Sequence, residues 1–437
     1  MMVPSRRWLV IAAALAVLAP LGLAGATFTG VWLGLCAAWS LALIVDLGRV
    51  RQFNWAALVL DRDAPPALSI GRSLPVRYRW QHPRDATLWV RESSPASIVS
   101  EPRDRLIALR ANRSIVEDRT LQPRTRGHST GWRFDLRVRS PWGLAWRQTR
   151  RDLPWEITVY PRLRTAALAQ LPSQSRMRQE AGLRQVRRLG EGRLFESLRD
   201  WVPGDEMRTV DWKATARRGR LMARQYEDER RQRVILALDA GRLLTAESDG
   251  RARIEDAIEA IAQLASRAAE LDDDIGLLVF SDRIDQYVPP VRGRRALRTI
   301  LDALAAVEGK LVEPDYPAAF AFLASQTRKR ALAIVFTDVI DRFASDAFVS
   351  QIGRLRPRHL PVAVTIRDLG LEGLAATRPT GTDAAFERAA AEQLLQVRAD
   401  ALNELRARGV VIVDTTPDSA PQAVVECYLT LKRRGLI

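Results

Sequence analysis

The sequence has little of the chemistry on which many enzymes depend. Its 437 residues include two cysteines and three histidines. Cys36 and Cys427 lie far apart, so the sequence indicates neither a disulfide framework nor a zinc site, and a reducing compartment is consistent with this. His82, His128 and His359 are scattered along the chain. This scatter argues against a catalytic triad and against acid–base chemistry that depends on histidine.

Common catalytic and nucleotide-binding motifs are also missing. The sequence contains no H-E-x-x-H helix and no protein-kinase set. Gly127-His128-Ser129-Thr130-Gly131 fits the G-x-S-x-G pattern, but it lies among short alternating runs and not between a strand and a helix, as a nucleophile elbow requires. Gly190-Glu191-Gly192 is too weak a match for a phosphate loop, because no Gly-Lys-Ser/Thr ending follows it. An enzyme built from this sequence would have to work with carboxylates and arginines alone. We therefore predict that the protein is not an enzyme.

Positive charge is abundant and unevenly distributed. The formal net charge is +16, and residues 49–165 contain 23 arginines against 11 acidic residues, whereas residues 234–437 contain 26 basic and 29 acidic residues. The excess lies next to an apolar N-terminal segment, where it suits attraction to an anionic membrane surface within roughly 8 Å. Binding of nucleic acid or another polyanion through the arginines is the weaker alternative.

The N-terminal segment is apolar over a length that suits two membrane helices. Residues 8–45 form a run of 38 without a charged side chain, whereas one helix needs about 20 residues to cross a bilayer. We predict a transmembrane helical hairpin within residues 1–48, with helices at about 8–23 and 31–47.

Basic residues on both sides of the apolar run indicate its orientation. Arg6 and Arg7 precede the run, and Arg49 and Arg51 follow it. By the positive-inside rule, both ends face the cytoplasm. The prediction is a multi-pass protein of the inner (cytoplasmic) membrane whose soluble bulk is cytoplasmic. The alternative is a cleaved signal peptide, for which Ala24-Gly25-Ala26 offers a cleavage site.

The rest of the chain shows two kinds of periodicity. Residues 49–165 contain short alternating runs separated by Pro, Gly and Ser clusters, which predicts a membrane-proximal antiparallel β domain. In residues 233–437, short apolar runs alternate with amphipathic helical stretches, which predicts a doubly wound α/β domain with a mostly parallel sheet. Residues 166–232 fit neither pattern and are dense in arginine and in acidic residues.

The centre of this charged segment combines a turn with aromatic and ionic residues. Pro203-Gly204-Asp205 is a turn signal. Asp211-Trp212-Lys213 then places an acid, an aromatic ring and a base in succession. Carboxylates here suit bidentate bonds from nearby arginines. Two interpretations stay open: an ion-pair network that braces two domains, or a docking face or phosphate-type anion site.

This stretch resembles the signature of the bacterial family called domain of unknown function 58. The residues that carry the resemblance are Arg199, Gly204, Asp205, Arg208, Asp211, Trp212, Ala216 and Arg217. The resemblance implies a membrane-anchored protein with a von Willebrand factor A-like domain in residues 233–437. It also implies a MoxR-type AAA+ ATPase as partner. The corresponding function is that of an adaptor or scaffold in protein maturation or remodelling at the membrane.

Two aspartates follow strand-like runs of the expected α/β domain. Asp239 and Asp338 fall where ligands bind in such sheets, at the carboxyl ends of strands. The arrangement resembles the metal-ion-dependent adhesion site of von Willebrand A domains, whose Asp-x-Ser-x-Ser loop helps to hold Mg²⁺. Here Gly241 and Leu243 stand in place of the serines, and Arg242 brings a positive charge to the position of the cation.

Two outcomes are therefore open for this edge of the sheet. In the favoured one no metal binds, and Asp239 and Asp338 cap helices and pair with Arg242. In the other, Asp315 restores an oxygen ligand, and Asp239, Asp315 and Asp338 hold Mg²⁺ in a metal-dependent hydrolase. No other cofactor is predicted.

Overall fold

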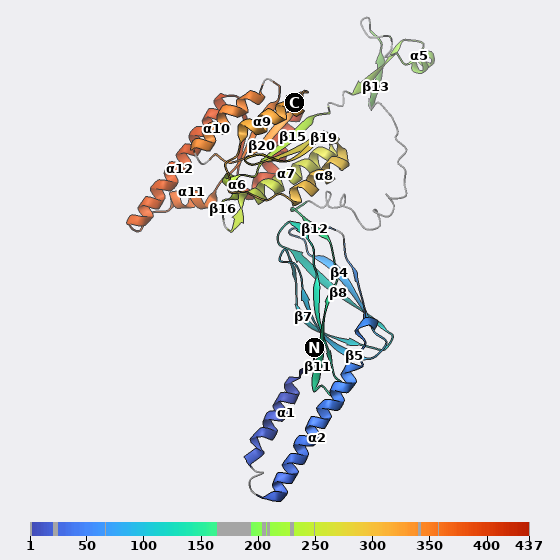
Figure 1. Cartoon of the computed structure of the whole chain (residues 1–437). Coiled ribbons are helices and arrows are strands. Elements are labelled where there is room, and N and C mark those ends of the chain that lie inside the picture. The colour runs from blue at the N-terminus through green and yellow to red at the C-terminus, as the bar shows by residue number, and fades with distance from the viewer. Residues whose placement is uncertain are drawn as a thin grey trace. The chain divides into compact units, whose positions relative to one another are not determined.

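The computed structural model describes residues 2–20, 25–65, 67–163, 194–202, 207, 210–227, 231–248, 250–339, 342–356 and 358–436. The chain divides into two compact units (Figure 1). The first comprises Met1–Gln174 with Leu301–Glu308, and the second comprises Ser175–Ile300 with Gly309–Ile437.

Two apolar helices lie side by side in the first unit (Figure 1). They are α1 (Arg6–Val17) and α2 (Ala26–Arg51), and Trp32 Nε1 of α2 donates to Leu15 O at 2.9 Å. Among the described residues, α2 is the one helix long and apolar enough to cross a membrane. With 12 residues, α1 is shorter than the first helix we predicted and too short to span about 30 Å alone. An N-terminal anchor is supported, whereas a second crossing is not shown.

The β strands of the first unit form a four-stranded, a five-stranded and a three-stranded sheet. Their burial alternates, as in β4, where Val76, Tyr78 and Trp80 point into a core that the sheets enclose. In sheet order the strands are β2 (Val59–Asp63), β4 (Leu74–Gln81), β8 (Ser114–Pro123) and β6 (Ile98–Ser100); β1 (Met2–Pro4), β11 (Ala145–Asp152), β10 (Arg133–Arg139), β5 (Ala86–Ser93) and β7 (Asp104–Leu109); and β3 (Ala67–Ser69), β12 (Ile157–Tyr160) and β9 (Gly127–Ser129).

The second unit contains a six-stranded sheet that confirms the predicted doubly wound α/β architecture. In sheet order its strands are β19 (Ile284–Arg292), β18 (Asp274–Phe280), β15 (Arg233–Asp239), β20 (Leu332–Phe336), β21 (Leu360–Ile366) and β22 (Val411–Thr415). All neighbours pair in parallel except β18 and β19. The strand order reverses between β15 and β20, so a topological switch point lies there.

Helices accompany this sheet. They are α6 (Arg242–Thr245), α7 (Arg253–Glu270), α8 (Gly293–Ala305), α9 (Tyr316–Gln326), α10 (Arg342–Ile352), α11 (Leu369–Ala376), α12 (Thr382–Ala407) and α13 (Ala420–Arg433). The central strand β15 is fully apolar and buried from Val234 to Leu238, as expected for a parallel strand covered on both faces. A separate hairpin precedes the sheet and consists of β13 (Leu194–Asp200), α5 (Trp212–Arg218) and β14 (Met222–Glu227).

Candidate functional sites

Asp239 ends β15 at the switch point, and its side chain is fully buried among neutral donors. Oδ1 accepts from the Gly241 amide at 2.8 Å, and Oδ2 accepts from the hydroxyls of Tyr316 at 2.9 Å and Thr337 at 2.7 Å. Burial raises the pKa of Asp239 to about 6, because desolvation outweighs the three hydrogen bonds. A Cβ at position 241 would lie 2.9 Å from Val312 O, so glycine is required there.

Asp338 follows β20 and is neutralised by two arginines. Arg253, at the start of α7, forms an ion pair with Oδ2, and Arg398 of α12 donates to Oδ1 at 3.1 Å. The Val339 amide also donates to Oδ1, at 2.8 Å. Arg253 and Arg398 are 4% and 6% exposed. Arg398 also forms an ion pair with Asp414 at 2.6 Å, so positive and negative groups alternate across this edge of the sheet.

The third predicted metal ligand has a different role. Asp315 caps α9, and its carboxylate accepts from the Ala318 amide at 2.9 Å. The next residue, Tyr316, is the one that reaches Asp239. Arg242 forms an ion pair with Glu313 at the surface. The loop that we expected to supply an oxygen ligand therefore supplies a hydroxyl donor to a carboxylate.

These groups do not fit a magnesium site. A hard cation needs several oxygen ligands with free lone pairs. Both oxygens of Asp239 and both of Asp338 already accept hydrogen bonds or ion pairs. Within the ranges that the structure describes, no three His, Cys, Asp or Glu side chains gather as a metal-binding group. Arg253 and Arg398 supply the positive charge that a cation would otherwise bring.

Sequence reasoning missed four residues of this cluster. Thr337 and Tyr316 had a local signal, because each adjoins an aspartate that the motif pointed to. Arg253 lies 85 positions from Asp338 along the chain. Arg398 lies 60 positions from it, inside a long helix where local sequence does not mark it.

The family motif forms a second candidate site, of which the structure describes one capped helix. Asp211 is the N-cap of α5 and accepts from the Ala214 amide at 3.0 Å. Gly219 ends the helix at φ +67°, and its amide donates to Thr215 O at 2.9 Å. Thr215 Oγ1 accepts from the Met222 amide at 3.0 Å, which ties α5 to β14.

One side of α5 faces solvent. Trp212 is 62% exposed, and Lys213, Ala216 and Arg217 are also exposed. Trp212 and Ala216 are four residues apart, as are Lys213 and Arg217, so each pair lies on one face of the helix. This surface, formed by Trp212, Lys213, Ala216 and Arg217, is called the motif face below.

Other parts of the motif are outside the described residues. These are Gly204, Asp205 and Arg208, together with the side chain of Arg199. Beside the motif face, Asp200 and Arg220 form an exposed ion pair at 2.9 Å. The described motif residues thus combine a helix cap, Asp211, with the solvent-facing surface that the cap positions.

Comparisons with known proteins place these features in context. An uncharacterized protein of Mycobacterium tuberculosis and one of Mycobacterium bovis are each 24% identical over 273 residues, covering 57% of this chain and 80% of the relative. The SpRpn10 VWA domain is 12% identical with a TM-score of 0.28, covering 45% of this chain and 92% of that domain. Alpha-2-macroglobulin of Escherichia coli is 10% identical with a TM-score of 0.20, covering 24% of this chain and 7% of that one.

Because these structural likenesses are weak, the α/β architecture is assigned from the order and pairing of the strands in this chain. The model of the family described as "Protein of unknown function DUF58" matches residues 197–403, a range that contains the motif face, Asp239 and Asp338. Over this region the chain is similar to the DUF58 family.

Proposed function

We propose that the protein is a membrane-anchored protein-interaction module that docks its partner through the motif face. The observation that carries this proposal is the 62% exposure of Trp212 on a helix that a cap and a hairpin hold in place. Tryptophan and arginine are the residue types that most often dominate the energy of protein interfaces. A tryptophan ring kept in water beside Lys213 and Arg217 suits a partner that combines an apolar pocket with acidic groups.

The carboxyl edge of the α/β sheet has a structural role in this proposal. A hydrolase that uses Asp239, Asp315 and Asp338 would need these carboxylates to converge on a cation or on water. Instead, Asp315 caps a helix, and Asp338 is enclosed by two guanidiniums. The interaction module is therefore favoured over the hydrolase.

The proposed partner is a MoxR-type AAA+ ATPase, as the family resemblance implies. In this function the protein acts as an adaptor or scaffold that holds the ATPase at the inner membrane during maturation or remodelling of other proteins. The proposal further requires that the motif face is on the cytoplasmic side, where ATP is available.

The ends of the two apolar helices are tied to the same turn of the β domain, and the flanking Arg6, Arg7, Arg49 and Arg51 assign that side to the cytoplasm. The Ser5 amide, just before α1, donates to Leu144 O at 2.8 Å. Asp46, near the end of α2, accepts from the amides of Trp142 at 3.0 Å and Leu144 at 3.1 Å. One turn of the β domain thus holds the start of α1 and the end of α2. We propose a hairpin that enters and leaves the membrane on the cytoplasmic side.

The test is co-purification of the tagged full-length protein after cross-linking in membranes, with bound ATPase quantified by mass spectrometry. The double variant Trp212→Ala/Arg217→Gln should recover about tenfold less ATPase than wild type, because hot-spot residues each contribute about 2 kcal/mol or more to binding. The control is Trp142→Ala, which removes an exposed tryptophan of the β domain. Wild-type recovery with the double variant would overturn the motif face as the docking site, and recovery of nucleic acid in place of ATPase would favour the polyanion alternative.

A further inference from the structure

An arginine-lined cavity lies on the outer face of the five-stranded sheet, where α1 begins. It has a volume of about 470 Å³. Its charged and aromatic lining consists of Arg6, Arg7, Trp89, Arg137, Arg139 and Trp146. We refer to these six residues as the collar pocket.

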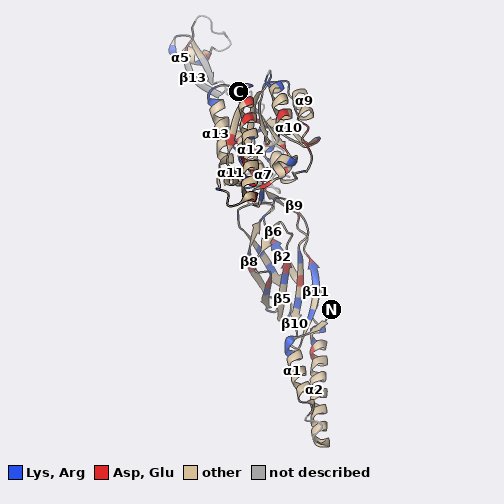
Figure 2. Ribbon diagram, turned by 90° about the vertical axis from the view of Figure 1, so that its left-hand side faces the viewer, with Lys and Arg blue, Asp and Glu red and all other residues tan. Residues whose placement is uncertain are grey.

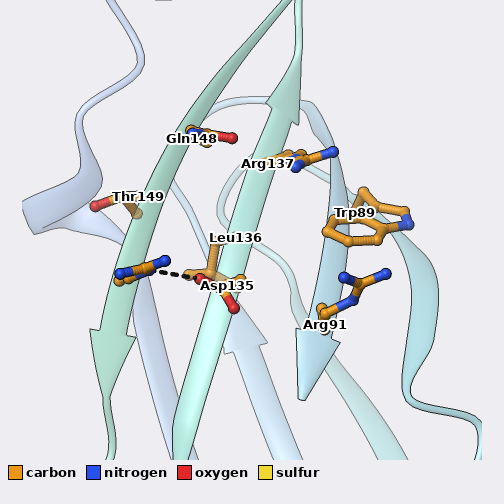
Figure 3. A pocket seen from close by; sticks show the side chains of 8 residues that line it. Trp89, Arg91, Asp135, Leu136, Arg137, Gln148 and Thr149 are labelled. Atoms are coloured by element: carbon orange, nitrogen blue, oxygen red, sulfur yellow. Dashed lines mark hydrogen bonds and ion pairs between the residues drawn. The ribbon is translucent and has the colours of Figure 1, made fainter. Parts of the chain in front are cut away.

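Strand register explains why these side chains meet. Arg137 and Arg139 are two positions apart on β10, so they point to the same face of the sheet. Trp89 of β5 pairs with Arg137, and Trp146 of β11 pairs with Arg139. The Arg137 guanidinium lies 4.8 Å from the centroid of the Trp89 ring. Figure 3 shows these two side chains together on the part of the face that continues the pocket.

Farther along the same face, arginines have carboxylate partners. Arg150 pairs with Asp135 at 3.1 Å, and Arg133 pairs with Asp152 at 3.1 Å. Within the described part of the chain, no Asp or Glu oxygen lies within ion-pair distance of Arg6, Arg7, Arg137 or Arg139. Arginines are therefore ion-paired at one end of the face, whereas in the collar pocket Arg137 has only a longer-range interaction, with Asp104.

The collar pocket lies at the end of the sheet face that is next to the apolar helices. β1 pairs with β11 and leads directly into α1, so Arg6 and Arg7 stand at the start of an apolar helix. Figure 2 shows basic residues at this start and along β11, whereas most of α1 and α2 carries no charge. A second cavity of about 790 Å³ adjoins the end of α2, and its charged lining consists of Arg49, Arg84, Asp85, Arg110 and Arg139. Arginines thus outnumber acidic residues where the apolar helices join the β domain.

We propose that the collar pocket binds the head group of an anionic glycerophospholipid. Guanidinium groups bind phosphate through paired N–H donors, and Arg137 and Arg139 present such groups on neighbouring outward positions of one strand. Tryptophan favours the boundary between membrane and water, where Trp89 and Trp146 flank these arginines. The inference rests on membrane anchoring by α2, and it does not depend on the partner of the motif face.

The test uses the full-length protein in nanodiscs of phosphatidylcholine and phosphatidylglycerol, with the lipid that stays bound after transfer to detergent measured by native mass spectrometry. Wild type should retain phosphatidylglycerol preferentially. In Arg137→Gln/Arg139→Gln the preference should fall roughly tenfold or more, since each arginine near an anionic surface contributes substantially to lipid binding.

The matched control is Arg133→Gln/Arg150→Gln, which removes the same charge from the same face at positions that already have aspartate partners. It should keep the preference within about twofold, as expected where arginines are already compensated. Equal losses of preference in both double variants would indicate general charge attraction and would overturn the proposed head-group site. An unchanged preference in Arg137→Gln/Arg139→Gln would overturn it as well. Recovery of the protein in the membrane after carbonate washing separates loss of anchoring from loss of head-group binding.

Discussion

The carboxyl edge of the α/β sheet and the hairpin that carries α5 use the same residue types at very different burial. Asp338, Arg253 and Arg398 are between 0% and 6% exposed, whereas the side chains of Asp200 and Arg220 are 53% and 61% exposed. Removing one partner of a buried pair leaves a charge without water or a counter-ion, while an exposed charge keeps its hydration. Arginine and aspartate therefore stabilise a domain in one region and form a solvent-exposed ion pair in the other.

The largest effect is expected for Asp338→Ala, which leaves both buried guanidiniums without their shared partner. The free energy of unfolding of the α/β domain should fall by about 3 to 5 kcal/mol, out of about 5 to 15 kcal/mol for a typical domain. Hydrogen exchange in the core strand β20 of the full-length protein measures this, because the slowest amides report global opening.

The control for this prediction is Asp315→Ala in the same domain. It removes a helix cap and should cost about 1 kcal/mol. Equal protection of β20 in Asp338→Ala and in wild type would show that Arg253 and Arg398 are not stabilised by Asp338. The contrast between the buried and the exposed region would then fail.

The second prediction concerns pH and Asp239. Its pKa is about 6 in the folded protein against an ordinary value of 3.8, so between these values the folded state holds a proton that the unfolded state has lost. Stability contributed by this group is full below about pH 4 and is lost as pH rises to about 6, a change of about 3 kcal/mol at 1.36 kcal/mol per pKa unit.

Hydrogen exchange in β15, measured from pH 4 to pH 7 and corrected for the intrinsic pH dependence of exchange, tests this loss. The variant Asp239→Asn should show a flatter profile. Asp256, whose pKa burial also raises to about 6, continues to titrate in the same range, so a residual slope is expected. A slope unchanged by Asp239→Asn would show that this carboxyl does not titrate there.

The fold was more predictable from sequence than the cluster that these two predictions probe. Val234 to Leu238 form a continuous apolar run because β15 is covered on both faces, and β4 alternates because one face is buried. Both patterns are local. Asp239 and Asp338 were found for the same reason, since each directly follows an apolar strand.

The partners of these aspartates were not predictable, because they are set by tertiary packing. Arg398 is one of many arginines in the chain and meets Asp338 only because α12 packs near β20 and β22. The sequence also placed the charge of Arg242 at the presumed cation position, whereas the ion pairs on Asp338 come from Arg253 and Arg398. The pairing of a buried aspartate with distant arginines cannot be read from local sequence.

A smaller effect is expected for Asp211→Ala in the exposed region. Loss of the N-cap hydrogen bond to the Ala214 amide should destabilise α5 by about 0.5 to 2 kcal/mol. Exchange of the amides of residues 212–218 measures this change, and Asp211→Asn should preserve most of the protection because asparagine caps nearly as well. A loss of about 3 to 5 kcal/mol that spreads beyond the hairpin would instead indicate a buried ion-pair brace.

The smallest effect is expected for the ion pair between Asp200 and Arg220, and it gives the sharpest test of the comparison. With both side chains more than half exposed, their coupling energy in a double-mutant cycle of Asp200→Asn and Arg220→Gln should lie below about 1 kcal/mol. Amide exchange in β13 and β14 provides the four stabilities. The coupling should shrink further as salt is raised, since exposed charges are screened over roughly 10 Å at 0.1 M. A coupling above about 2 kcal/mol that salt does not change would mean that another part of the protein covers the pair. In that case the charges next to the motif face would be a brace between parts of the chain, and the partner would have to dock elsewhere.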